Sequence, residues 1–201
     1  DRSGIYAKAY EEGDRSFDLV LKYIKALNRA DKSSQKVAND FLREKTGLSS
    51  NKKAEILYES LTLSDSRIFD LFVKERKLIE DKYSSKKVQE KIESACWSTV
   101  YNAVDFEVEE LLHEAQNKCK SNLSDKYKSF VLESNFEYYK GIDNADLMAE
   151  AALSLSKKLH KKNAQLLNHI CEDLYSVAFG REVILEASEK LAKMSADIDE
   201  K

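Results

Sequence analysis

The segment FDLVLKYIKAL, residues 17–27, decides the fold class of this chain. Its apolar residues recur at intervals of three and four, and polar residues occupy most of the positions between them. These apolar residues are Phe17, Val20, Leu21, Ile24 and Leu27. Such spacing places all of them on one face of an α-helix. The segment therefore predicts a helix that buries one face against the rest of the protein.

The same spacing continues through most of the chain. Further apolar stripes lie in residues 88–99, 108–119, 127–134, 147–159, 166–178 and 183–194. The chain has no proline and only five glycines, which disfavours a sheet fold with many turns. Candidate N-caps are Ser64, Ser84 or Ser85, Ser124 and Asp143, and the glycines near expected helix ends are Gly13, Gly47, Gly141 and Gly180. We therefore expect an all-α array of about 10–11 helices, in which short loops make antiparallel αα-hairpins.

Length and charge restrict the classes of protein further. The chain has 201 residues, of which 42% are hydrophobic and 34% charged, so it is long enough to bury a core. Its net charge of −3 gives no general attraction to nucleic acid, and no apolar run is long enough for membrane insertion. We expect one helical domain over residues 1–201, with 1–62 and 63–201 as sub-blocks. Because the sequence begins at Asp1, we expect it to be a fragment of a longer chain.

The final two expected helices show how such hairpins pack. Small residues at Cys171, Ser188, Ala192 and Ser195 would allow two helices to approach closely. Leu174, Tyr175 and Leu191 would fill the space between them. This is the packing pattern of a tetratricopeptide hairpin, although the glycine of its first helix and its terminal proline are missing. We therefore expect a tetratricopeptide-like, right-handed superhelix.

Residues with catalytic or metal-binding chemistry do not form a recognisable set. Cys96, Cys119 and Cys171 each continue an apolar stripe and are expected in the core, with a disulfide or a reactive thiol as the alternative. The three histidines, His113, His160 and His169, lack the spacing of a metal site, and Glu110–His113 is a lone ExxH. The basic run at residues 157–162 suits a helix C-terminus. We expect no catalytic residue, no metal and no cofactor.

Several short segments, taken in order, carry a family resemblance. They are GDRS at residues 13–16, residues 19–27, VANDFL at 37–42, residues 66–88, EYYKG at 137–141, residues 164–175 and residues 188–199. Together they resemble the helical region that follows the redox domain in exported thioredoxin-like proteins of Bacteroidetes. The similarity covers nearly the whole chain. The thioredoxin fold itself and its CxxC motif are absent from this sequence.

The resemblance implies a tetratricopeptide-like domain in a periplasmic or otherwise extracytoplasmic protein. It also implies that any thiol–disulfide oxidoreductase activity belongs to the parent protein and not to this chain. The expected partners are proteins: the N-terminal redox domain, a client or a second subunit. A structural homodimer is a further possibility.

Tyrosine and tryptophan are the candidates for protein contacts, because they combine apolar area with a polar group. The candidate residues are Tyr6, Tyr10, Trp97, Tyr138 and Tyr139, and packing at helix seams is the alternative role for them. The leading hypothesis is a non-catalytic helical scaffold accessory to an exported thioredoxin-family protein. The alternative is a small-molecule-binding or enzymatic domain with a site between helices, for which the cysteines and His169 are candidates.

Overall fold

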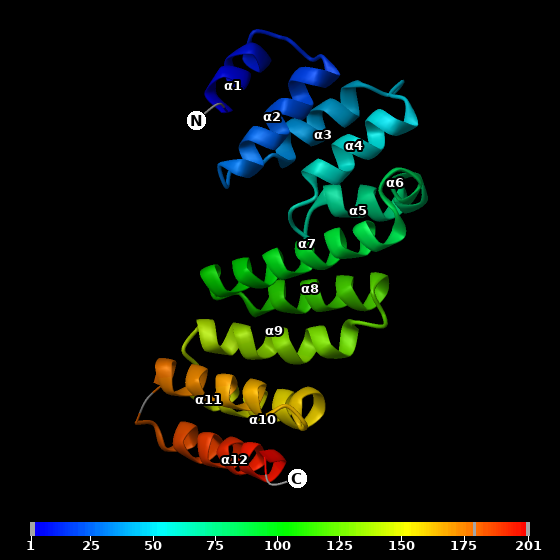
Figure 1. The fold of residues 1–201 in the computed structure, drawn as a ribbon. Helices are drawn as coiled ribbons and strands as arrows, with labels where there is room; N and C mark the ends of the chain where they lie inside the picture. Colours follow the sequence, from blue (N-terminus) through cyan, green and yellow to red (C-terminus); the bar gives the residue numbers. More distant parts are fainter. Residues whose placement is uncertain (1–2, 179, 200–201) are drawn as a thin grey trace. The chain divides into compact units, whose positions relative to one another are not determined.

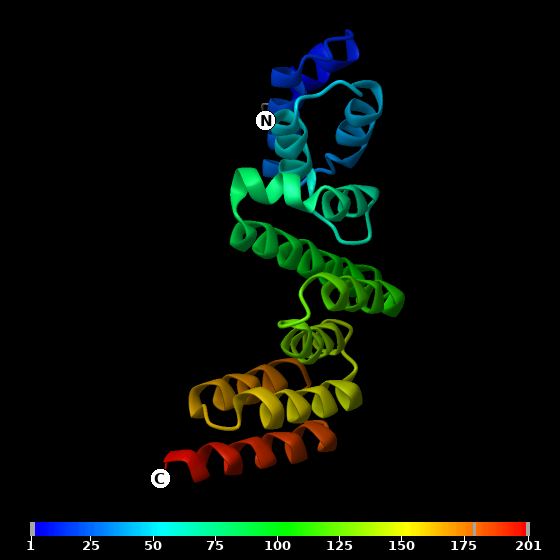
Figure 2. The same cartoon turned by 90° about the vertical axis from the view of Figure 1, so that its right-hand side faces the viewer.

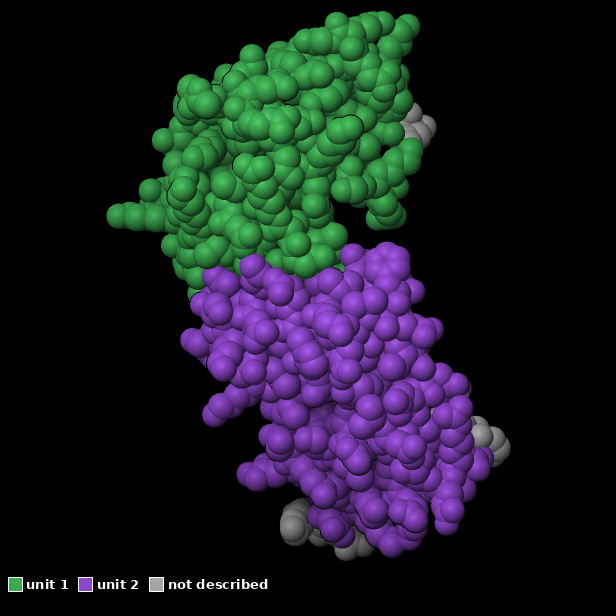
Figure 3. Space-filling view, turned by 180° about the vertical axis from the view of Figure 1, so that it is seen from behind, with its two compact units in different colours: residues 1–98 green, residues 99–201 purple. Residues whose placement is uncertain are grey.

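The computed structural model describes residues 3–178 and 180–199. Within those ranges it contains twelve α-helices, one π-helical turn and no strand (Figure 1). The expected all-α class is confirmed. The chain divides into two compact units, residues 1–98 and 99–201, which Figure 3 colours separately. The boundary that we considered at residues 62 and 63 falls inside the first unit.

The first unit, residues 1–98, is built from six helices and the first part of a seventh (Figures 1 and 2). These are α1 (Ser3–Glu11), α2 (Phe17–Arg29), α3 (Gln35–Glu44), α4 (Ser50–Ser60), α5 (Arg67–Lys74), α6 (Arg76–Tyr83) and α7 (Ser85–Phe106). The stripe of residues 17–27 is used as predicted, because Val20, Ile24 and Leu27 are buried. They face a core that also contains Phe41 and Phe72.

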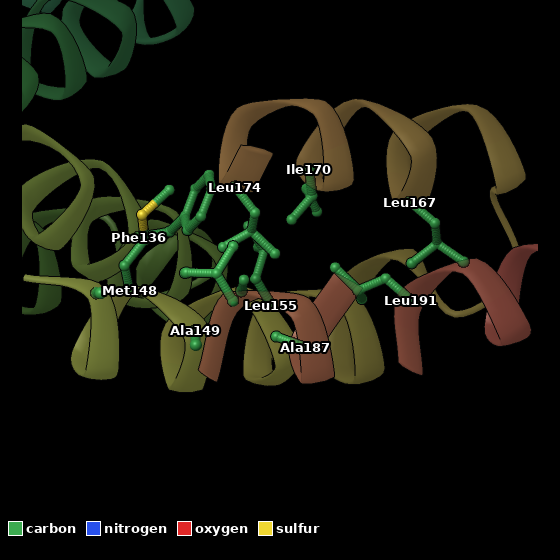
Figure 4. Packing of buried hydrophobic residues seen from close by; sticks show 12 residues of the cluster. Phe136, Met148, Ala149, Leu155, Leu167, Ile170, Leu174, Ala187 and Leu191 are labelled. Carbon is green, nitrogen blue, oxygen red and sulfur yellow. The ribbon is translucent and has the colours of Figure 1, made fainter. Parts of the chain in front are cut away.

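The second unit, residues 99–201, takes the end of α7 and the remaining helices. These are α8 (Glu109–Asn122), α9 (Tyr127–Gly141), α10 (Ala145–Leu155), the π-helical turn (Ser156–His160), α11 (Ala164–Ala178) and α12 (Glu182–Asp199). Helices α9, α10, α11 and α12 enclose one apolar cluster, which includes Met148, Leu155, Leu174 and Leu191 (Figure 4). Helix α11 packs along α12, and α8 packs along α9.

Local capping differs from the prediction at three helix starts. Ser66 rather than Ser64 caps α5, because its hydroxyl accepts a hydrogen bond from the Phe69 amide at 3.2 Å. Asn144 rather than Asp143 caps α10, since Asp143 adopts a left-handed φ of 54°. Helix α9 begins at Tyr127 rather than after Ser124. Ser66 and Asn144 have the extended backbone that a cap needs, whereas Lys126 before α9 is helical and makes no side-chain cap hydrogen bond.

The α11–α12 hairpin confirms part of its predicted packing. Leu174, Leu191 and Ser188 are buried, and the Cys171 thiol donates to the Ser188 carbonyl at 3.4 Å. Tyr175 does not fill the space between the helices, because 41% of it is exposed. Ala192 is also exposed, which places it on the outer face of α12. Small residues therefore allow close approach at Ser188 and Ser195, but not at Ala192.

Candidate ligand-binding groove

Two of the predicted contact residues, Tyr6 and Tyr10, lie half-buried on α1. The Arg15 guanidinium stacks 3.5 Å from the centre of the Tyr10 ring and also donates to the Tyr10 carbonyl. The Tyr23 ring lies 5.6 Å away on the adjoining helix. Burial raises the pKa of the Tyr10 hydroxyl, although Arg15 partly opposes the shift. Tyr10 thus already has partners inside the first unit.

The other three predicted contact residues are separated between the units. Trp97 is half-buried on α7 in the first unit. In the second unit the Tyr139 hydroxyl donates to Glu109 Oε1 at 3.1 Å, and its ring meets Tyr138 edge-on at 5.4 Å. Only 3% of Tyr138 is exposed, so its ring serves the packing of its own unit here. The contact role of all five residues stays a prediction.

The cysteines and histidines do not gather into a site. None of the three cysteines forms a disulfide within the described residues, and Cys96 and Cys119 are buried while Cys171 is half-buried. His169, a candidate for a site between helices, has 70% of its side chain exposed, and its Nδ1 atom lies 3.6 Å from Glu172 Oε2. Among the described residues, no three histidine, cysteine or acidic side chains are grouped to hold a metal ion.

A stacked aromatic pair in the first unit shows tyrosines that pack between helices, which is the alternative to a role in protein contacts. The rings of Tyr58 and Tyr83 lie 3.9 Å apart, and Lys91 Nζ lies 5.5 Å from the centre of the Tyr58 ring. Burial lowers the pKa of the Lys91 ammonium, and Glu59 only partly opposes it. Burial, followed by the charges of Glu55 and Glu59, raises the pKa of Tyr83 to about 12. This cluster fills the space where α4, α6 and α7 meet.

The most distinctive concavity is a groove of about 440 Å³ in the first unit, which we call the leucine groove. Four helices, α3 to α6, and the loop between α3 and α4 contribute to its wall. Its lining residues are Asn39, Leu42, Arg43, Lys45, Thr46, Leu48, Ser50, Lys53, Leu57, Arg67, Leu71 and Leu78. The lining thus contains five leucines and four cations but no acidic residue.

The leucines give the groove an apolar wall that the protein itself leaves partly open. Leu57 is fully buried beneath it. Leu42, Leu48, Leu71 and Leu78 are only half-buried, and they come from α3, the following loop, α5 and α6. The Asn39 Oδ1 atom in the same wall is buried and accepts no hydrogen bond from the described residues. Because solvent does not reach that oxygen, we do not count it as a contact for a ligand.

The four cationic side chains of the groove differ in whether they have an ion-pair partner. Lys53 Nζ lies 2.8 Å from Glu75 Oε1, and Arg43 Nη2 lies 2.8 Å from Asp40 Oδ1. Among the described residues, neither Lys45 nor Arg67 has an ion-pair partner, and both are exposed. Lys45 directly follows α3, and Arg67 begins α5. The groove therefore presents uncompensated positive charge beside an apolar wall.

A second, more open concavity of about 760 Å³ lies in the second unit and is mainly acidic. Its lining includes Asp146 and Glu182, which occupy the first turns of α10 and α12. Carboxylates at these positions are stabilised by the amide groups of a helix start. Arg181 also neutralises Asp143 there at 3.1 Å. Helix stability thus accounts for Asp146 and Glu182, and the ion pair accounts for Asp143, whereas two further lining carboxylates, Glu107 and Glu186, lie outside helix starts.

The sequence analysis missed the leucine groove. A partial signal was present, because Leu42, Leu48, Leu71 and Leu78 lie outside the stripes that we followed, and because residues 43–53 are rich in lysine and arginine. Nothing in that signal shows that Leu42 and Leu78, 36 positions apart, would line one groove.

Comparisons with family models, with curated proteins and with solved structures find no match to this chain. In the described ranges, every helix is too short or too polar to cross a membrane.

Proposed function

We propose that this chain is a non-catalytic helical binding domain that holds a ligand in the leucine groove. The observation that carries this proposal is the open apolar wall of the groove, to which α3, α5 and α6 and a loop contribute half-buried leucines. Small-molecule sites have volumes of about 300–1,000 Å³ and are lined mainly by apolar side chains with a few polar groups. The volume of 440 Å³ and the composition of the groove fit that description. The sequence left open a protein scaffold and a small-molecule-binding domain with a site between helices. The groove supports the second of these roles.

Binding of a small neutral naphthyl dye, N-phenyl-1-naphthylamine, tests the proposal. Its emission rises in apolar sites, so we expect a saturable increase with one dye bound per chain. Leu48→Gln should weaken binding roughly tenfold, because the loss of one apolar contact of about 1.4 kcal/mol corresponds to that factor. The matched control is Leu185→Gln, which alters an exposed leucine of α12 in the other unit.

The pattern across the two variants decides the outcome. The proposal requires that Leu48→Gln weakens the dye and that Leu185→Gln does not. Dye binding that is not saturable, or that both variants change equally, contradicts a site in the leucine groove. Circular dichroism of both variants ensures that a loss of binding is compared between folded proteins.

A protein-interaction role is the second candidate. We propose it for the setting that the family resemblance implies, as a tetratricopeptide-like accessory domain of an exported, periplasmic thioredoxin-family protein. Its partner would be the redox domain of the parent, a client or a second copy of the chain. The supporting observation is that seven of the eight large apolar side chains exposed among the described residues, including Phe106 and Leu185, belong to the second unit. Exposed aromatic and leucine side chains are common in protein interfaces.

Crosslinking tests this second role. The domain, mixed with the parent redox domain, should form a crosslinked pair through the second unit. Phe106→Ser, which removes a side chain that is 67% exposed, should reduce the yield. Ile5→Ser, at a 71% exposed position of α1, is the matched control in the first unit. An equal yield for both variants, or no crosslinked pair at all, would refute this role for the second unit.

A further inference from the structure

The charge balance of the leucine groove selects among possible ligands. No acidic side chain lines it, and two of its four cations are already neutralised by Asp40 and Glu75. The remaining cations, Lys45 and Arg67, are exposed and have no ion-pair partner among the described residues. An uncharged ligand would gain no charge–charge attraction from these two side chains, and a cationic ligand would be repelled by them. A ligand with a negative group would be attracted to it.

The apolar wall and the volume of the groove set the size of the rest of the ligand. At about 30 Å³ for each water-sized group, the groove volume of 440 Å³ holds roughly 15 such groups. This is enough for a chain of about ten carbons with a small head group. The half-buried leucines offer such a chain contacts that water cannot provide.

Resting on the proposed binding role of the groove, we propose that its ligand is a small anionic amphiphile with one aliphatic chain and a carboxylate. The chain lies against Leu48, Leu71 and the neighbouring leucines, and the carboxylate lies between Lys45 and Arg67. An arginine suits this role, because its planar guanidinium can donate two parallel hydrogen bonds to a carboxylate. Lys45, which also lines the groove, adds a second positive charge.

Displacement of the naphthyl dye by three ligands of equal chain length tests the proposal. The ligands are decanoate, decan-1-ol and decylamine, which carry a negative, a neutral and a positive head group. Exposed ion pairs contribute about 0.2–1 kcal/mol each, so two of them should make decanoate roughly tenfold tighter than decan-1-ol. Decylamine should bind most weakly. Raising the salt concentration should narrow these differences, because exposed charges are screened.

A double variant assigns the preference to the two cations. In Lys45→Gln/Arg67→Gln, decanoate should bind no more tightly than decan-1-ol, while the affinity for decan-1-ol stays unchanged. The matched control is Lys22→Gln/Arg29→Gln, which removes the same two charge types from exposed positions of α2. This control should keep most of the tenfold preference.

The outcomes separate this inference from the proposed function. If the dye binds in the groove but decanoate and decan-1-ol compete equally, or none of the three ligands displaces it, the inference is wrong and the binding site stands. A preference that persists in Lys45→Gln/Arg67→Gln also overturns the inference. If the dye does not bind in the groove, the proposed function itself fails.

Discussion

Replacing Gly141 by alanine should destabilise the second unit. Gly141 is the last residue of α9, and a Cβ atom there would lie 3.0 Å from Val104 Cγ2 and 3.2 Å from Val104 Cβ, with Cγ1 closer still. Val104 is β-branched, so its χ1 is restricted and the side chain cannot easily rotate away. Either α7 or the end of α9 must therefore move to accept the methyl group.

The expected cost follows from two opposing effects. Overpacking of this kind costs about 1–3 kcal/mol. Alanine in place of glycine in a helix stabilises the folded protein by up to about 1 kcal/mol, because an alanine loses less backbone freedom on folding than a glycine does. We expect a net loss of about 1–2 kcal/mol in the free energy of unfolding. For a unit of about 100 residues, each kcal/mol lowers Tm by about 4–8 °C.

A double-mutant cycle measured by urea unfolding provides the assay. Gly141→Ala, Val104→Ala and the double variant should show a coupling free energy of about 1 kcal/mol, because Val104→Ala removes Cγ1 and Cγ2, the two atoms that lie closest to the new methyl group. Gly47→Ala is the control, since a Cβ there meets no atom within 4 Å. The reasoning is refuted if Gly141→Ala is as stable as the wild type. It is also refuted if its cost is the same in the Val104→Ala background.

Three further predictions concern the core, the pH dependence and the thiols. Leu174→Ala should lower the free energy of unfolding in urea by about 2–5 kcal/mol, because the Leu174 side chain is fully buried. Tyr175→Ala, at an exposed position, should lower it by less than about 1 kcal/mol. Equal losses in the two variants would contradict the packing of α11. The pKa of Tyr83 is raised to about 12, so the unfolded chain loses this proton first and stability should fall as pH rises from 10 to 12. This fall should be smaller in Tyr83→Phe when thermal unfolding is followed at each pH, and an unchanged fall would reject the shift. Only Cys171 should react with a thiol reagent in the native protein, since the other two cysteines are buried; labelling of all three at equal rates would be inconsistent with this.

Helices were predictable where the spacing of apolar residues along a segment places them all on one face. The stripe that ends at Leu27 and the stripe around Leu174 both became buried faces, because each depends only on local spacing. Caps were less predictable. Asp143 and Asn144 are adjacent and both suited to capping, and only the left-handed backbone at Asp143 decides between them.

The leucine groove was beyond the reach of sequence reasoning for a different reason. Leu48 lies in a loop, whereas Leu71 and Leu78 lie on separate helices. Their convergence depends on how α3, α4, α5 and α6 pack, which no single-helix pattern contains. The same is true of charge, since Lys45 and Arg67 are distant in the sequence and share one cavity only in the folded unit.

The two concavities of this protein differ in how much of their composition local stability explains. In the acidic concavity of the second unit, two of the five carboxylates, Asp146 and Glu182, occupy helix starts, where they stabilise the helices that carry them. A single half-buried leucine is equally ordinary on a protein surface. In the leucine groove, however, four half-buried leucines converge beside two cations without ion-pair partners among the described residues. Helix stability accounts for Lys45, which directly follows α3, but not for Arg67, which begins α5, and core burial does not account for the half-buried leucines. An occupant that buries the leucines and neutralises Lys45 and Arg67 accounts for both features at once.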